Sequence, residues 1–139
     1  MKTTLDLIDI LWTLINGSAL KTALVSGGGI YKHERPLNSN NEDVVINSLP
    51  IINQDLQVAI CNVNIHVPDK TINVTGGQQI VADHVRLKAL STVAVGVLDK
   101  NWGDDYNFSV QQQTVMADET PGSHFINIRI EFFNINISN

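Results

Sequence analysis

The clearest pattern in the chain is an alternation of apolar and polar residues between Leu56 and Pro68. From Ala59 onward the odd-numbered positions in this stretch are apolar: Ala59, Cys61, Val63, Ile65 and Val67. Between them lie Asn62, Asn64 and His66. Successive side chains of a strand point to opposite faces, so the pattern predicts a long strand with one face in a core. Pro68 has no N–H for a ladder and is expected to end the strand.

The beginning of the second face of this strand is apolar as well. Val58 and Ile60 lie there, on the side that later carries the polar residues. We expect this half of the strand to be covered twice, by a helix on one face and by a partner chain on the other.

Two regions show the three- and four-residue spacing of helices. Thr4 is expected to cap a first helix that Gly17 ends, and Ser18 caps a short second one over 19–24. The first helix has apolar residues at helical steps: Leu5, Ile8, Leu11, Trp12 and Ile15. The main core helix is expected from about Gln78, and its apolar stripe is Ile80, Val81, His84, Val85, Leu87, Leu90 and Ala94. Its end stays open, because the β-branched residues of 92–95 could already form a strand.

Four further strands complete the prediction. They cover 30–35, 43–49, 106–116 and a closing stretch in which Ile126, Ile128, Ile130 and Phe132 alternate with Asn127, Arg129 and Glu131. The polar segments 37–42 and 69–77 are expected to be loops. The predicted fold class is α+β, one domain over residues 1–139, with helices packed on a mainly antiparallel five-stranded sheet in the order α-(α)-β-β-β-α-β-β.

Charge and composition narrow the classes of function. The net charge of −5 opposes a dedicated nucleic-acid binder, which usually carries a basic stripe. No apolar stretch approaches the roughly 20 residues of a membrane helix. Asp6 and Asp9 interrupt the apolar run near the start, so we expect no export signal and a cytosolic origin. The single Cys61 is expected to be a small buried hydrophobe.

The sequence shows no catalytic signature. The histidines at 33, 66, 84 and 124 fall in four different predicted elements without a paired ligand spacing. The glycines at 27–29 lack the Gly-Lys-Ser/Thr ending of a phosphate loop. We therefore expect no enzyme and no catalytic, cofactor-binding or metal residues. Two alternatives stay open: a metal-dependent hydrolase or nuclease using Glu42, Asp43 and a histidine, and a ligand-binding domain with a pocket between helix and sheet.

The polar strand faces are rich in amides rather than charges. The amides in question are Asn47, Asn62, Asn64, Gln111, Gln113 and Asn127. Amide side chains both donate and accept hydrogen bonds, and their burial does not isolate a charge. Such a face suits a subunit contact, and the loops 37–42 and 69–77 suit docking of a partner. A solvated sheet face with ordinary loops accounts for the same residues.

The order of segments and several strand phrases resemble a known family. The phrases are residues 30–36, 42–50, 63–68 and the ending 124–132. Together they resemble the tail-completion or tail-terminator proteins, which join head and tail in tailed phages and prophages. The resemblance covers nearly the whole chain but includes no catalytic motif.

The resemblance implies a structural protein without cofactors, made in the cytoplasm of the bacterial host and located in the virion. Such proteins form rings, commonly hexamers, that cap the tail tube and join it to the head connector or stopper. Residues 37–43 would then meet a partner ring, and the closing strand with the amide-rich face would meet the next subunit. DNA would only pass through the lumen, and no membrane is involved. Another phage neck or tail-tip adaptor remains an alternative.

Overall fold

The computed structural model describes residues 1–25, 27–119 and 121–135. Within these residues the elements follow the order α1 (Thr4–Asn16), α2 (Ala19–Ala23), β1 (Ile30–Lys32), β2 (Asp43–Ser48), β3 (Leu56–Pro68), β4 (Lys70–Val74), β5 (Gly77–Val81), α3 (His84–Leu98), β6 (Asn101–Trp102), β7 (Tyr106–Ala117) and β8 (Ser123–Ile135). Strands make up 45% of the structure and helices 25%.

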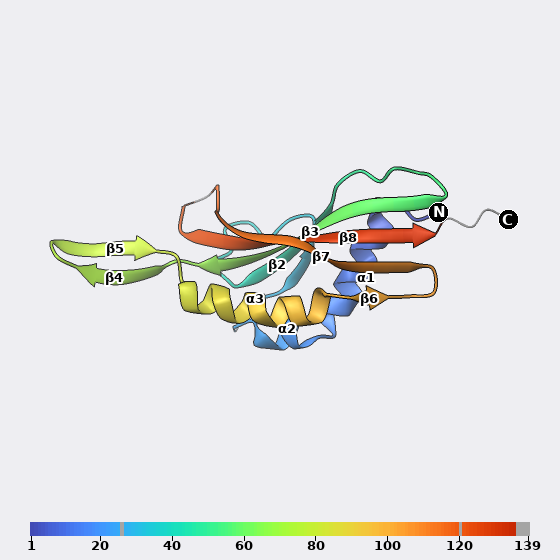
Figure 1. The fold of residues 1–139 in the computed structure, drawn as a ribbon. Helices are drawn as coiled ribbons and strands as arrows, with labels where there is room; N and C mark the ends of the chain where they lie inside the picture. The colour runs from blue at the N-terminus through green and yellow to red at the C-terminus, as the bar shows by residue number, and fades with distance from the viewer. Residues whose placement is uncertain (26, 120, 136–139) are drawn as a thin grey trace.

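The predicted five-stranded sheet is wrong. The described residues form a curled, mixed six-stranded sheet in the order β1-β2-β3-β8-β7-β6, and a separate two-stranded sheet of β4 and β5 (Figure 1). The expected three-strand meander fails because β1 runs parallel to β2. The short strand β6 was not predicted, since its two residues carry no detectable alternation.

The central strand lies where the alternation placed it. β3 pairs antiparallel with β8 along its whole length, with Cys61 opposite Ile130, and with β2 on its other side. The odd-numbered side chains of β3 and the even-numbered ones of β8 fill the core, and Cys61 is fully buried as expected. Burial raises the pKa of its thiol to about 11, so it stays protonated.

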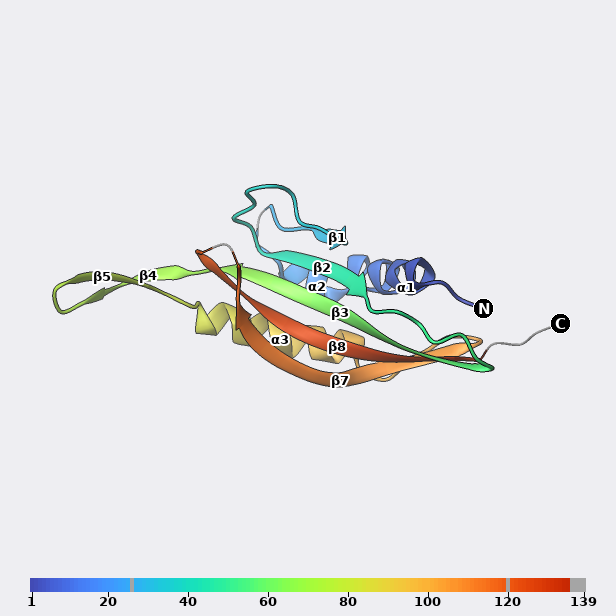
Figure 2. The same cartoon turned by 90° about the horizontal axis from the view of Figure 1, so that it is seen from above.

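All three helices cover one face of the sheet (Figures 1 and 2). α1 packs on β1 and β2, α3 packs on β3, β7 and β8, and α2 contacts both α1 and α3. α1 begins at Thr4, and its cap is Thr3, one residue before the predicted cap: the Thr3 hydroxyl accepts from the Asp6 N–H, and the Asp6 carboxylate accepts from the Thr3 N–H. Gly17 ends it as expected. The opposite face of the sheet, which we call the outer face, carries no helix among the described residues.

The segment predicted as a loop followed by a helix is instead a β-hairpin. β4 and β5 pair around a Thr75–Gly76 turn, and Gly76 takes a φ of 93°, which favours glycine. The helix begins only at His84, because Asp83 caps it by accepting from the Arg86 N–H. The described helix runs through residues 92–95 to Leu98, so these β-branched residues are helical rather than a strand.

Candidate assembly surface

The outer face carries the amides that the sequence analysis singled out. Asn62 donates to Asn47 (3.0 Å), and Asn127 donates to both Asn62 (3.1 Å) and Asn64 (2.7 Å). These four half-buried side chains form a hydrogen-bonded row across β2, β3 and β8, which we call the amide row. The row is uncharged, and its members partly satisfy one another, so a partner could cover it without stranding a charge.

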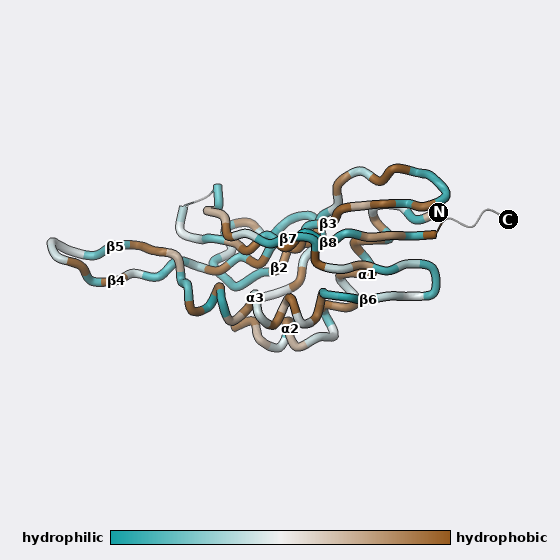
Figure 3. The backbone as a smooth tube through the Cα atoms, viewed as in Figure 1, coloured by the Kyte–Doolittle hydropathy of each residue, from teal (hydrophilic) through white to brown (hydrophobic). Residues whose placement is uncertain are grey.

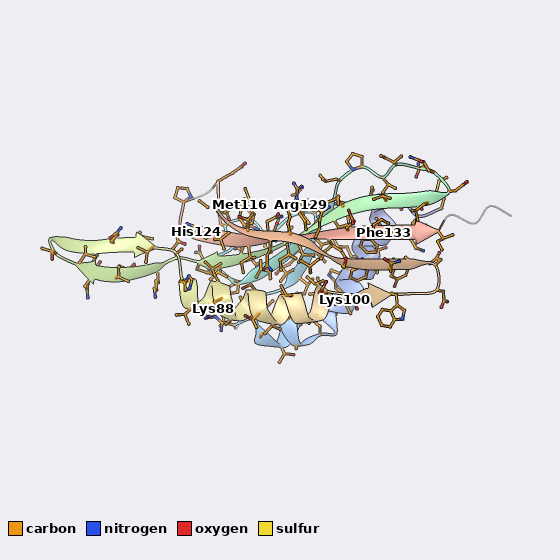
Figure 4. The ribbon with its side chains drawn as sticks, in the orientation of Figure 1. Lys88, Lys100, Met116, His124, Arg129 and Phe133 are labelled. Carbon is orange, nitrogen blue, oxygen red and sulfur yellow. The ribbon has the colours of Figure 1, made fainter. Side chains whose placement is uncertain are left out.

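Arg129 extends this face toward β7. It lies on β8 opposite Asn62 and Gln112, on the side of the sheet away from α3 (Figure 4). Its Nε is buried without a hydrogen-bond acceptor among the described residues. Gln111, also predicted for this face, sits at a β-bulge and donates to Glu131 instead. Arg129 and Gln111 thus continue the polar part of the outer face from β8 onto β7.

An apolar patch occupies one end of the outer face. Its members come from β3, β8 and the 49–52 segment: Leu49, Ile52, Leu56, Val58, Ile60, Phe133 and Ile135. Ile52 is 62% exposed, and Leu56, Val58 and Ile135 are exposed as well. The second apolar face expected from Val58 and Ile60 is therefore present, and the described part of the chain leaves it uncovered. Clustered apolar exposure of this kind marks interaction sites.

A charged network closes the other end of the outer face. Arg35 contacts Asp43 (3.0 Å) and Asp118 (3.4 Å), while His66 Nδ1 lies 2.9 Å from Asp118. Burial and the nearby Arg35 lower the pKa of His66, although Asp118 opposes the shift. The Ser123 hydroxyl donates to Asp118 (2.8 Å) and not to His66, so these residues do not form a Ser–His nucleophile pair. The network ties the 33–42 loop to the sheet beside a cavity of about 280 Å³.

The residues of the hydrolase alternative point apart. Glu42 and Asp43 are consecutive and face opposite sides of the sheet. Two hydrogen bonds from Arg86 (2.7 and 2.8 Å) and one from the Val25 N–H hold Glu42. Burial alone would raise the pKa of Glu42. The hydrogen bonds lower it by more, so its pKa lies below the usual value. Asp43 forms an ion pair with Arg35 at 3.0 Å. Each carboxylate is thus committed to an arginine.

The predicted histidines are likewise dispersed over the structure. His33 follows β1, His66 lies in β3, His84 begins α3, and His124 in β8 pairs with Asp69 at 2.7 Å. Among the described residues no three His, Cys, Asp or Glu side chains converge as metal ligands.

For the ligand-binding alternative, a groove lies between α1 and the β6–β7 end of the sheet. It has a volume of about 430 Å³ and is lined by Asp9, Ile10, Thr13, Leu14, Asn101, Trp102, Tyr106 and Phe108. Of these residues, Asp9 is already engaged by Lys32 at 2.7 Å. The groove therefore presents mainly apolar and aromatic side chains, with few polar groups to orient a ligand.

The far half of β7 is an uncovered edge. β6 pairs only with Asn107 and Phe108, and Asp99 accepts from the Val110 N–H (3.1 Å). Residues 111–117 are all exposed and pair, within the described chain, only with β8 (Figure 2). They contain neither a charge nor a proline, the usual devices that protect an edge from another chain. We call residues 111–117 the free edge.

The β4–β5 hairpin projects beyond the end of the sheet (Figures 1 and 2). We call it the arm. Its ten strand residues are exposed except for the half-buried Val81. They include hydrophobic residues in both strands (Figure 3), namely Ile72, Val74 and Ile80. A two-stranded hairpin on its own is marginally stable in water, so the arm is suited to gain a partner.

Sequence reasoning found the four residues of the amide row, and Val58 and Ile60 of the apolar patch. It wrongly placed Gln113 on the same face, since Gln113 lies opposite the core residue Ile128. It missed the free edge and the arm. The signal for the arm was present, because the Thr-Gly-Gly at 75–77 separates two runs that contain β-branched residues.

No protein-family model matches this chain, and neither does any curated protein sequence. None of the helices in the described ranges is long and apolar enough to span a membrane.

Proposed function

We propose that this chain is a structural subunit, not an enzyme, and that copies of it assemble into a ring. The proposed setting is the neck or tail of a tailed phage or prophage, where the ring caps the tail tube and joins it to the head connector. The observation that carries the proposal is the uncovered outer face, with its exposed apolar patch beside a self-bonded amide row.

Three features support this reading. The outer face offers apolar area for association and neutral amides for specificity, a combination suited to a subunit interface. The two carboxylates of the competing enzyme reading are held by arginines. The phage setting rests on the resemblance of the strand phrases, and the net charge of −5 suits a conduit that must not retain passing DNA.

The first test is the mass of the purified protein by light scattering over a concentration series, with negative-stain microscopy of the assembled fraction. A closed ring of fixed stoichiometry is expected, either alone or on the ends of added tail tubes. A chain that stays monomeric throughout and binds no tube ends contradicts the proposal.

A matched pair of variants locates the interface. Ile52→Glu places a charge in the apolar patch, whereas Val85→Glu places one on α3 at a residue of similar exposure, 67% against 62%. We expect Ile52→Glu to weaken assembly at least about tenfold, because a charge would have to lose its water in the interface. Val85→Glu should assemble like the unmodified chain. Equal behaviour of the two variants would place the interface elsewhere.

A further inference from the structure

The arm and the free edge have complementary unpaired backbones. We infer that the arm of one subunit adds a strand to the free edge of the next, with β5 lying along residues 111–117. This inference rests on the proposed self-assembly and specifies the contact that would propagate it. The partner is a second copy of the chain.

The hairpin register shows which groups of the arm are free to pair. Val74 and Gly77 close a two-residue turn and are hydrogen-bonded to each other, as such turns require. Hydrogen-bonded and non-hydrogen-bonded pairs alternate along an antiparallel ladder. The pair Asn73–Gln78 is therefore non-hydrogen-bonded, and both residues direct their N–H and C=O groups away from the hairpin. On β5, Gln78 and then Ile80 present these groups outward.

The same alternation identifies the outward groups of β7. The Leu49 N–H binds the Ile60 carbonyl, so Ile60 faces β2. The next residue, Cys61, therefore directs its N–H and C=O groups to β8, where they meet those of its partner Ile130. Arg129, one position before Ile130, directs its own groups to β7, and those of its partner Gln112 point back to β8. Gln113 and every second residue after it therefore direct N–H and C=O groups to the open side of the sheet. Unpaired groups of this kind are a template for a strand from another chain.

The two edges match in length and chemistry. β5 has five residues and the free edge seven, so the shorter strand fits within the longer one. Neither carries a charge, and each contains glutamines followed by β-branched residues: Gln78, Gln79, Ile80 and Val81 in the arm, and Gln111, Gln112, Gln113, Thr114 and Val115 on the edge. The outer edge of β4 matches the free edge less well than that of β5, because β4 contains the charged Lys70.

An arm cannot reach the free edge of its own subunit. Asp69 alone separates β4 from β3, and only Ala82 and Asp83 separate β5 from α3. These short connections hold the arm beyond the end of the sheet, while β7 runs back along the body (Figure 2). Each subunit thus gives one arm and receives one arm, a head-to-tail contact that closes into a ring when the rotation permits.

Proline substitutions test the pairing at the backbone. Gln78→Pro removes an outward N–H of β5, and Asn73→Pro removes the matching outward N–H of β4 in the same residue pair. Both variants keep the ladder of the hairpin, because proline is tolerated where the N–H faces outward. Under the conditions in which the unmodified chain assembles, Gln78→Pro should raise the concentration needed for assembly at least about tenfold. Asn73→Pro should leave it unchanged.

A mixing experiment makes the test decisive. Gln113→Pro damages the free edge but leaves the arm intact, and Gln78→Pro does the reverse. At a concentration below that at which either variant assembles alone, each alone should be monomeric, while an equimolar mixture should give 1:1 heterodimers and nothing larger by light scattering. Circular dichroism melts verify folding, and Val115→Lys, which charges the same edge, replaces Gln113→Pro if that variant unfolds.

The outcomes separate this inference from the proposed function. If the unmodified chain forms rings and Gln78→Pro does too, the arm contact is refuted and the ring proposal stands. Equal weakening by Asn73→Pro, or a mixture without heterodimers, also refutes the pairing of β5 with the free edge. If the unmodified chain never assembles, the ring proposal fails and this contact fails with it.

Discussion

The two faces of the sheet at β3 and β8 come from the same strands but differ in what their side chains contact. On the helix side Cys61, Ile65 and Ile128 have no exposed surface, and shape complementarity to α1 and α3 decides what fits. On the outer face Asn62 and Asn127 are half-buried and bound to each other. The helix side fixes the fold. The outer face bonds the amides of the amide row to one another and leaves the apolar patch exposed.

The largest expected difference between the faces comes from truncating a core residue. Ile128→Ala should lower the free energy of unfolding by about 2–5 kcal/mol, because it leaves a cavity against the helices. Ile52→Ala, on the outer face, should change it by less than about 0.5 kcal/mol. Urea unfolding at a concentration where the chain is monomeric measures both. Similar losses for the two variants would show that the outer face is packed as tightly as the core.

A smaller loss is expected from the neighbouring residue on the other face. Asn127→Ala removes both hydrogen bonds that hold Asn62 and Asn64 and should cost about 1 kcal/mol, since water can replace part of them. The same urea titration applies, with the exposed Gln112→Ala as a control near zero. A cost as large as that of Ile128→Ala would mean that the amide row acts as core rather than as an interface.

The smallest effect is a pH dependence from His66. Its pKa is lower in the folded chain, so the unfolded chain binds the proton first as the pH falls. Stability should therefore be full above about pH 6.5 and decline as the pH drops toward the folded pKa, by no more than about 1.4 kcal/mol per pH unit. Arg35, Asp118 and Asp43 are the charges that face it.

Comparison with His66→Gln isolates this contribution. The difference in unfolding free energy between the two proteins should change between pH 7 and 5. The lowered pKa of Glu42 acts only below its ordinary value of 4.5, outside that window. A difference that is constant with pH would contradict the assigned role of His66.

Sequence reasoning succeeded where a local pattern and burial coincide. β3 was predicted with its bounds, because one face lies in the core and apolar and polar residues alternate strictly from Cys61 to Val67. The same alternation correctly placed Asn62, Asn64 and Asn127 on one face. These residues meet because β3 and β8 pair in register.

Sequence reasoning failed where long-range strand pairing or topology determines the structure. Ile80, Val81 and His84 mimic a helical stripe, but a Thr-Gly-Gly turn and the Asp83 cap assign them to a strand and then a helix start. Pro68 ends β3 as predicted, but no local pattern indicated that a new strand, β4, begins two residues later. The parallel pairing of β1 and the open edge at residues 111–117, as far as the structure describes the chain, depend on long-range order, which no short pattern encodes.

The continuity of β3 and β4 has a mechanical consequence. A single extended segment runs from the middle of the sheet to the tip of the arm, interrupted only at Asp69. A pull on the arm would therefore be transmitted along β3, which is paired with β8 over thirteen residues and with β2 over six. Because ladder hydrogen bonds lie perpendicular to the strands, such a pull loads many of them together in shear. A neighbouring subunit bound to the arm would thus be connected to the longest strand pairing described in the sheet, that of β3 with β8.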